Sequence, residues 1–227
     1  MNAVTRFDDL AATYEAWFDT PLGRYVARSE KELILGLLRP TYADVILEVG
    51  SGTGYFLREL AGSGARCIGI EPSVEMLAVA VSRSGGIIDY VRGRGEALPF
   101  ESGAFDALLF MTTLEFAQDV EAAVREAARV TRPGGHLVCG VLNEDGPWAR
   151  ARRREGGLWN EARFFRAAEL AALLSPLGAV RVSFCVHVPP QFSRLPGPCL
   201  SLMDGLLRRL FPASGALIGA HVTLGRQ

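Results

Sequence analysis

The chain has 227 residues and a mass of 24.5 kDa, which suits one α/β domain with a modest extension and is too short for two independent domains. Its 24 basic and 25 acidic residues give a net charge of -1, so no broad positive field attracts nucleic acid or an anionic membrane. The start lacks the pattern of a signal peptide, and no apolar stretch reaches spanning length. We expect a cytoplasmic protein without stable membrane insertion and without nucleic acid as a partner.

The first half of the chain alternates between helical and strand-like patterns. Apolar residues at helical spacing predict helices over 7–18 and 22–38, the second ending before Pro40. A β-branched run over 44–49 predicts a strand, which stops in a glycine loop at 50–54 before helical spacing resumes at Tyr55. Further strands are predicted at 66–70, 87–91, 105–111 and 136–142, with helices at 74–82 and 120–130. This alternation indicates a parallel sheet.

The second half begins with a stretch of different composition. Residues 143–157 are rich in arginine and glycine and contain Pro147 and Trp148, which indicates an excursion above the sheet. A helix over 161–174, a strand over 180–188, a helix over 199–211 and a strand over 216–224 are predicted after it. Repeats and polar linkers are absent from the sequence, so one domain is expected over 1–227.

Metal chemistry is disfavoured by the distribution of cysteine and histidine. The four cysteines lie far apart, no C-x-x-C pair occurs, and there are only three histidines. Three of the cysteines fall in strand-like runs, where they are expected to be small buried hydrophobes in a reducing compartment. No metal ligand is therefore assigned.

The glycine loop indicates a nucleotide site, because glycines let the backbone approach a ligand and the next helix offers free N–H groups. The spacing Gly50-x-Gly52-x-Gly54 departs from the dinucleotide fingerprint, since Tyr55 and Leu57 stand where a third glycine belongs. A P-loop is excluded as well, because Gly54 is followed by Tyr55 rather than by Lys.

Two acidic residues favour a ribose without phosphates. Glu48 lies two residues before Gly50, where a carboxylate would repel a phosphate and attract a cationic, hydrogen-bond-donating group. Glu71 ends the next predicted strand, which is the position from which a carboxylate binds vicinal ribose hydroxyls.

Five motifs in order then carry a family resemblance. They are Glu48-Val-Gly-Ser-Gly-Thr-Gly54, Gly69-Ile-Glu-Pro-Ser73, Gly95-Glu-Ala-Leu-Pro-Phe100, Phe105-Asp106 and Arg132-Pro-Gly-Gly135. Together they resemble the ubiquinone/menaquinone-biosynthesis type of class I S-adenosylmethionine-dependent methyltransferase. The leader Phe7-Asp8, with Tyr14 and Trp17, resembles the N-terminal helix of that family.

The resemblance implies an α/β fold with a Rossmann-like seven-strand sheet, mostly parallel with an antiparallel last strand, and helices on both faces. It divides the chain into an N-terminal helical cover at 1–40, a donor-binding core at 41–142, and an acceptor-side excursion with the last two strands at 143–227. It implies S-adenosylmethionine as cofactor, S-adenosylhomocysteine as product, and methyl transfer by in-line displacement.

Carried over residue by residue, the resemblance places Gly50–Gly54 beside the amino-acid part of the cofactor, Glu71 on its ribose hydroxyls, and Gly95–Glu96 beside its adenine. The full set of expected cofactor-binding residues is Tyr14, Glu48, Gly50, Ser51, Gly52, Thr53, Gly54, Glu71, Pro72, Ser73, Met76, Gly95, Glu96, Ala97, Met111 and Thr112. Arg94 stands where the family often has an aspartate that reaches the adenine amino group.

Structural interpretations of the same residues stay open at this stage. Glu48 can orient the loop, Gly50–Gly54 can be a tight turn, and Glu71 can cap the helix after Pro72. Glu96 and Asp106 can each be a surface or capping acid. The Arg132–Gly135 segment is expected to be a structural turn before the fifth strand.

The acceptor is expected to be a small molecule. The segment Met111–Phe116 lacks the N/D-P-P-Y/F pattern of nucleic-acid amino-methyltransferases, and no catalytic base can be named. Aromatic residues outside the strand pattern are expected either to line a cover over the acceptor or to belong to the core. Those assigned to the substrate side or lid are Trp17, Phe18, Trp148 and Phe116.

Two rival functions remain from the sequence alone, a nucleotide-cofactor oxidoreductase and a non-catalytic S-adenosylmethionine-binding protein. The apolar helix over 199–211 can be core, lid, dimer contact or lipid contact. The sequence leaves the acceptor atom and the oligomeric state open.

Overall fold

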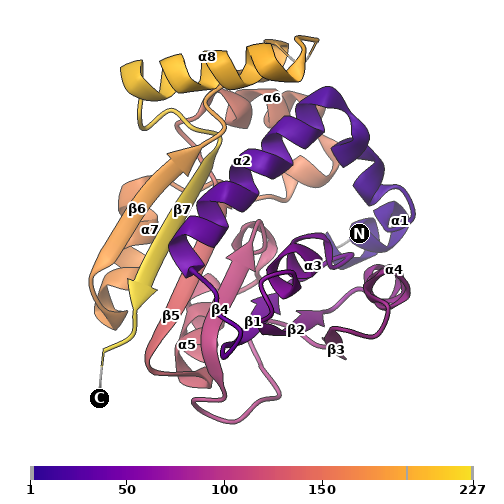
Figure 1. The fold of residues 1–227 in the computed structure, drawn as a ribbon, viewed down its shortest axis with the longest axis vertical. Helices are drawn as coiled ribbons and strands as arrows, with labels where there is room; N and C mark the ends of the chain where they lie inside the picture. The colour runs from indigo at the N-terminus through magenta and orange to yellow at the C-terminus, as the bar shows by residue number, and fades with distance from the viewer. Residues whose placement is uncertain (1–2, 193, 226–227) are drawn as a thin grey trace.

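A computed structural model describes residues 3–192 and 194–225, and within them a seven-stranded sheet forms the centre of the molecule (Figure 1). The strands are β1 (Val45–Val49), β2 (Arg66–Glu71), β3 (Asp89–Arg92), β4 (Phe105–Met111), β5 (Thr131–Leu142), β6 (Val180–Cys185) and β7 (Leu217–Thr223). Their order is β3-β2-β1-β4-β5-β7-β6. Strand β7 runs antiparallel to β5 and β6, and the pairs among β1 to β5 are parallel. The predicted mixed sheet is confirmed.

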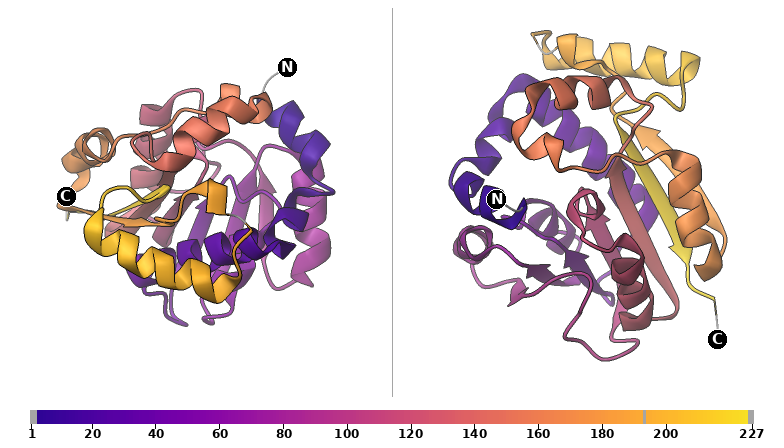
Figure 2. Two further views of the ribbon diagram at one scale, coloured as in Figure 1. Left: turned by 90° about the horizontal axis from the view of Figure 1, so that it is seen from above. Right: turned by 180° about the vertical axis from the view of Figure 1, so that it is seen from behind.

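Helices cover both faces of this sheet. The longer ones are α1 (Ala3–Leu10), α2 (Pro21–Leu38), α3 (Tyr55–Ala61), α4 (Val74–Ser84), α5 (Val120–Val130), α6 (Pro147–Glu155), α7 (Ala167–Leu174) and α8 (Gly197–Leu210). Short 3-10 helices are η1 (Tyr14–Asp19), η2 (Leu114–Phe116), η3 (Gly157–Asn160), η4 (Ser175–Leu177) and η5 (Pro190–Phe192). Helices α2 and α3 pack on one face, and α5 and α7 pack on the other (Figures 1 and 2).

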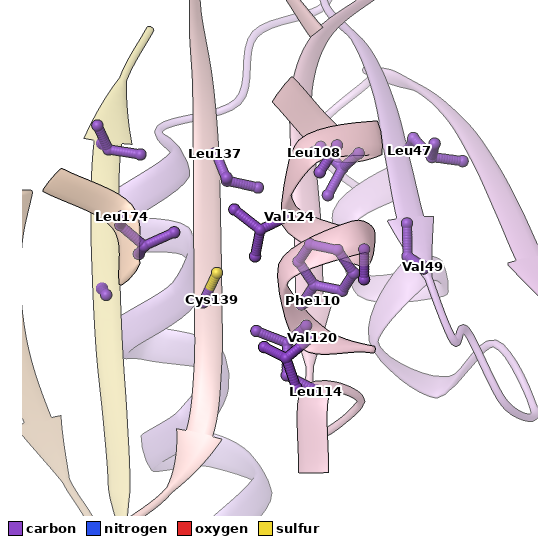
Figure 3. Packing of buried hydrophobic residues seen from close by; sticks show 14 of the residues in the cluster. Leu47, Val49, Leu108, Phe110, Leu114, Val120, Val124, Leu137, Cys139 and Leu174 are labelled. Carbon is purple, nitrogen blue, oxygen red and sulfur yellow. The ribbon is translucent and has the colours of Figure 1, made fainter. Parts of the chain in front are cut away.

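The central strands are buried on both faces, and their side chains alternate between two hydrophobic clusters. In β1, Ile46 joins the cluster under α2 and α3, whereas Leu47 and Val49 join the cluster under α5 and α7. Strand β4 repeats this alternation with Leu109 and Phe110. Figure 3 shows the second cluster, in which apolar side chains of the strands meet those of α5 and α7. Because both faces are covered, these strands appear in the sequence as continuous apolar runs.

The order of the strands creates the site. Strand β1 lies between β2 and β4, so the chain leaves β1 and β4 toward helices on opposite faces of the sheet. A crevice opens at the C-terminal ends of strands where connections diverge in this way. The glycine loop after β1 and the segment after β4 border that crevice.

The N-terminal helix predicted over 7–18 is wrong in one respect, because the structure divides it. Helix α1 ends at Leu10 and η1 begins at Tyr14, with a turn between them. The carboxylate of Asp8 accepts a hydrogen bond from the Ser73 hydroxyl at 2.5 Å, which ties α1 to the start of α4. Glu15 pairs with Arg58 at 2.9 Å. These tertiary contacts hold α1 and η1 in place separately. The spacing of apolar residues cannot predict such contacts.

The helix predicted over 161–174 is shorter than expected. Its first residues pair with neighbouring backbone, since the N–H of Arg163 donates to the carbonyl of Glu115 and the N–H of Phe165 donates to the carbonyl of Leu142, each at 2.9 Å. Phe165 is fully buried. The α7 helix therefore begins only at Ala167.

The turn predicted over 132–135 is also corrected. These residues lie inside β5, which begins at Thr131, and the pairing register with β4 shifts there. Thr131 pairs with Phe105 and His136 pairs with Ala107, so the intervening residues form an irregularity within the strand. The excursion predicted over 143–157 contains helix α6.

In the described part of the chain, no helix combines the length and the hydropathy that crossing a membrane requires.

Candidate functional site

The glycine loop is held against β2 by two backbone hydrogen bonds. The N–H groups of Gly50 and Ser51 donate to the carbonyl of Ile70 at 2.7 and 3.1 Å. A Cβ at Gly50 would lie 2.3 Å from the Thr113 methyl carbon, whereas a Cβ at Gly52 would have no atom within 4 Å. Gly52 has a φ of 53° and lines the cleft. Packing therefore requires glycine at position 50. A side chain at position 52 would instead extend into the open cleft.

Glu71 lies at the end of β2 and holds the glycine loop in place through a hydrogen bond. Its two carboxylate oxygens each accept a backbone hydrogen bond at 2.9 Å, one from Gly52 and one from Ser73. The residue is 6% exposed and lines the cleft. Burial raises the pKa of this carboxyl, and the two N–H groups oppose that shift. Each oxygen keeps a lone pair, so Glu71 can still accept hydrogen bonds from a ligand.

Glu48 faces the same cleft from the end of β1. It is 2% exposed, and its Oε2 atom has no hydrogen-bond partner within the described structure. Burial raises its pKa to about 8, with a further contribution from the negative charge of Glu71 and an opposing one from Arg58. An unpartnered buried carboxyl at a cleft wall favours a ligand that brings a donor or a positive charge.

The cleft is bordered by the C-terminal ends of β1, β2 and β4 together with α1 and η1. Most of the residues expected from the sequence line it. They are Tyr14, Phe18, Glu48, Gly50, Ser51, Gly52, Thr53, Glu71, Pro72, Met76, Gly95, Glu96, Met111, Thr112 and Phe116. Tertiary structure thus brings together residues from positions 14 to 116 of the chain.

Five expected residues lie elsewhere. Gly54 is the N-cap of α3, and Ser73 caps α4 by accepting a hydrogen bond from Met76 at 3.1 Å. Ala97 forms an isolated bridge with Arg94. Trp17 and Trp148 are also absent from the cleft lining. Gly54 and Ser73 position the two loops that do line it.

Trp148 is buried in the core, which is one of the two places that the sequence left open for it. It is 7% exposed, and its indole N–H donates to the carbonyl of Val188 at 2.8 Å. Arg152 lies over its ring at 5.2 Å, and also over Trp159 at 4.4 Å and Trp17 at 5.9 Å. Trp148 thus anchors α6, and the arginine connects α6 to η1.

The N-terminal segment covers one side of the cleft with aromatic rings. Phe7 meets Phe116 edge to face at 5.0 Å, and Phe18 stacks on Tyr55 at 4.0 Å. All four rings line the cleft. Phe7 and Tyr55 were not among the site residues expected from the sequence, because the local pattern does not show which ring each will meet.

Tyr14 of η1 also lines the cleft. Burial raises its pKa to about 12, and the nearby carboxyls of Glu30, Glu71 and Glu48 contribute in the same direction. Its hydroxyl therefore stays protonated near neutral pH and can donate a hydrogen bond. It is not suited to act as a base.

Two further buried acids, Glu115 in η2 and Glu30 in α2, were not among the residues expected from the sequence, and the charge of Glu115 acts on Glu30. Glu115 accepts a hydrogen bond from the Leu142 N–H at 2.6 Å through Oε1, and its Oε2 has no partner in the described structure. Burial raises the pKa of Glu115 and of Glu30 to about 8, and Arg152 opposes the shift of Glu30.

Among the described residues, no group of acidic, His and Cys side chains has the arrangement of a metal site.

The far side of the cleft contains Arg94, Gly95 and Glu96. One carboxylate oxygen of Glu96 accepts a hydrogen bond from the N–H of Gln118 at 2.8 Å, just before α5. Asp106 accepts from the Val45 N–H at 2.8 Å and from Arg132 at 2.6 Å. Asp106 is structural, whereas Glu96 both supports the start of α5 and borders the cleft.

Comparison with known proteins identifies the family. A family profile described as "Methyltransferase domain" matches residues 47–139. An uncharacterized protein of Mycobacterium tuberculosis is 38% identical over 191 residues, covering 81% of this chain and 64% of that protein. An uncharacterized protein of Methanocaldococcus jannaschii is 32% identical over 76% of this chain and 80% of its own length. The demethylmenaquinone methyltransferase of Mycolicibacterium gilvum is 39% identical over 60% of this chain and 58% of its own length.

Among solved structures, a Thermotoga maritima protein described as a SAM-dependent methyltransferase, possible histamine N-methyltransferase, is similar over almost its whole length. The identity is 27%, the TM-score is 0.79, and the match covers 98% of this chain and 99% of that one. The chain spans 64% of the length of the mycobacterial relative.

Proposed function

Because the chain belongs to the class I S-adenosylmethionine-dependent methyltransferases, we propose that it transfers a methyl group from S-adenosylmethionine to a small-molecule acceptor. The observation that carries this proposal is the cleft wall formed by Glu48, the loop Gly50–Gly54 and Glu71. This wall presents the carboxyl groups of Glu48 and Glu71, which suit a ribose and a cationic amino acid and disfavour a pyrophosphate.

The residues of the wall fit the cofactor of the family in three places. Gly52 leaves open space for close approach of a ligand, and Glu48 has a buried oxygen without a partner. Glu71 keeps free lone pairs for two ribose hydroxyls, since each oxygen accepts one backbone bond. We assign the amino-acid part to the Glu48 side and the adenine to Gly95 and Glu96.

The bound cofactor supplies an electrophilic methyl group on a sulfonium, and the protein's own contribution is alignment. Glu48, the loop Gly50–Gly54 and Glu71 would hold the cofactor so that its methyl group could be transferred to an acceptor lone pair, with the sulfur keeping the electrons of the broken C–S bond. Exclusion of water by α1 and η1 and hydrogen bonding by the protonated Tyr14 hydroxyl serve this step. We assign no catalytic base.

The acceptor side of the cleft is aromatic. Phe7, Phe18, Tyr55, Phe56 and Phe116 line it, which favours a small acceptor with apolar or planar surface. Trp148 is not part of this set, since it is buried in the core. Two of these rings, Phe7 and Phe18, come from the proposed cover at 1–40, and the other three come from the proposed donor-binding core at 41–142.

Of the two rival functions, an oxidoreductase is disfavoured by family membership and by the carboxylates at the loop. A binding protein without catalysis remains the alternative, because it could keep every residue of the cofactor wall. Turnover separates the two. Methyl-labelled S-adenosylmethionine is incubated with the protein and a fractionated metabolite extract, and formation of labelled product together with S-adenosylhomocysteine is measured.

The expected result is calorimetric binding of S-adenosylmethionine and S-adenosylhomocysteine, followed by transfer of label that the Gly52→Val variant does not support. Absence of binding for both compounds would overturn the assignment of the cofactor. Binding without transfer to any fraction would instead identify a non-catalytic binder.

A further inference from the structure

Helix α8 forms the outer layer of the molecule, and its inward side is fully accounted for (Figures 1 and 2). Leu200 is buried, and Met203 packs against the cluster under α2. The carboxylate of Asp204 accepts hydrogen bonds from the Tyr25 hydroxyl and from the His187 N–H, the latter at 2.7 Å. These contacts fix which side of the helix faces away from the protein.

The outward side of α8 is an apolar stripe. Leu202, Leu206 and Leu210 are spaced by four residues, which places them on one face of a helix. Their exposed fractions are 80%, 58% and 60%, and the adjoining Phe211 is 57% exposed. Single exposed apolar residues are ordinary, but a continuous helical stripe of large ones indicates a contact surface.

The charges beside this stripe are positive. Between Pro189 and Phe211 the charged residues are Arg194, Asp204, Arg208 and Arg209. Asp204 faces inward, whereas the three arginines are exposed. The net charge of the whole chain is -1, so this positive charge is local to α8 and the segment before it.

A groove between α8 and α2 lies beside this surface. Its charged lining residues are Arg24, Arg28 and Arg208 together with Glu32 and Asp204. Arg28 pairs with Glu32, and Arg24 donates to the backbone carbonyl of Asp19.

We propose that the outward face of α8 binds the surface of a lipid bilayer that contains anionic lipids. Leu202, Leu206 and Leu210 enter the boundary between headgroups and acyl chains, and Arg208 and Arg209 contact lipid phosphates. The helix has 14 residues, which at about 1.5 Å per residue is shorter than the hydrocarbon core of roughly 30 Å. It therefore lies in the plane of the surface.

The charges favour lipid over a second copy of the chain. A twofold contact through this face would bring arginines of both copies into one interface, and the outward side of α8 offers no carboxylate to pair with them. Lipid phosphates supply the missing negative charge.

The position of α8 relates this surface to the cleft. In the views from the side and from above, α8 lies at the end of the molecule toward which the parallel strands point, which is the end that contains the cleft (Figures 1 and 2). The proposed membrane contact does not depend on methyl transfer.

The test is flotation with vesicles of phosphatidylcholine alone and of phosphatidylcholine mixed with phosphatidylglycerol. We expect the full chain to float with the mixed vesicles and to be released as salt is raised, since binding to headgroups is screened. The double variant Leu202→Asp, Leu206→Asp should lose binding by about tenfold or more, because each change places a charge where an acyl chain is expected. Arg208→Glu with Arg209→Glu should reduce binding to the mixed vesicles by a similar factor.

The matched control is Val81→Asp with Ile87→Asp. These side chains are 58% and 71% exposed, so the same kind of change is made at comparable exposure away from α8. This control should float like the unmodified chain, and all variants should keep their melting temperature and their binding of S-adenosylhomocysteine.

Three results would overturn the proposal. One is that the unmodified chain floats with neither kind of vesicle. Another is that the α8 variants and the control lose flotation equally. The third is that light scattering finds a dimer that Leu206→Asp converts to a monomer, which would make a second copy the occupant of this face.

Discussion

At the scale of single residues, the cleft contains a few positions at which a substitution should weaken ligand binding for a specific physical reason. Gly52 leaves open space at a positive φ, and Glu71 holds two backbone N–H groups while lining the cleft. For each residue, the effect of a substitution on cofactor binding can be measured separately from its effect on folding.

Glu71→Ala should weaken binding of S-adenosylhomocysteine by roughly 1.5–3 kcal/mol, the scale of hydrogen bonds to a charged group. Calorimetry measures this loss, and circular dichroism reports whether the fold survives. Glu101→Ala, at an exposed acid in a loop, is the control. An affinity in Glu71→Ala equal to that of the unmodified chain would remove Glu71 from the ribose site.

Gly52→Val should abolish cofactor binding, because the new side chain would enter the cleft and would also disfavour the φ of 53°. Gly85→Val is a matched control, since Gly85 has a φ of 60° and equally open space but lies at the end of α4. Both variants should lose a similar amount of thermal stability, and only the first should lose calorimetric binding. Equal binding in both would place the ligand outside this loop.

At the scale of elements, the N-terminal segment acts as a unit distinct from the sheet. Helix α1 is tied to α4 through Asp8, and η1 is tied to α3 and α4 through Glu15, which contacts Arg58 and Arg83. Helix α6 behaves differently, since Trp148 anchors it in the core. Trp17 and Phe18 on one side and Trp148 on the other, all expected on the substrate side or lid, therefore lie in two segments that are anchored differently.

Binding of S-adenosylhomocysteine should slow hydrogen exchange over residues 3–19, because a ligand in the cleft adds contacts to that segment. Exchange over α6 should change little, since its anchor is buried without ligand. Strand β6 serves as the reference. Equal exchange of residues 3–19 in both states would mean that this segment is not a cover that closes on the ligand.

At the scale of the whole molecule, folding gathers acidic groups from distant parts of the chain. Glu30 comes from α2, Glu48 from β1 and Glu115 from η2, and all three are buried. Their pKa values rise from 4.5 to about 8, chiefly because of burial. These acids are far apart in sequence, so only the packed structure perturbs them together.

The stability of the ligand-free protein should therefore fall as pH rises from about 4.5 to about 8. In that window the folded protein keeps protons on these carboxyls that the unfolded chain has released. The carboxyls therefore contribute their full stabilisation below the unfolded pKa of 4.5, and this contribution is lost as the pH rises through the folded pKa of about 8. Thermal melting at a series of pH values measures the slope.

Glu115→Gln should flatten that slope, since glutamine does not titrate and its carbonyl can still accept the Leu142 N–H. Glu101→Gln, at an exposed position, should leave the slope unchanged. A slope in Glu115→Gln as steep as that of the unmodified chain would show that Glu115 already ionises near its ordinary pKa in the folded protein.

The sequence by itself predicted the sheet and the residues from Glu48 to Glu71 that line one side of the cleft. Continuous apolar runs predicted the central strands, because both faces of a parallel sheet are buried, and the ordered motifs from Glu48 to Gly135 carried the family resemblance that implied the strand arrangement. The glycine loop and Glu71 were predictable because each lies at the end of a strand, and parallel strands bring their ends to one edge.

Only the tertiary structure decided which faces and which distant partners meet. Trp148 lies in the core because its indole reaches Val188, forty residues away, and the helix predicted over 7–18 is divided because Asp8 and Glu15 bond to other elements. The outward stripe of α8 became identifiable once Asp204 was seen to face Tyr25. Local spacing specifies that a helix has two sides, and long-range packing specifies which of them meets the protein.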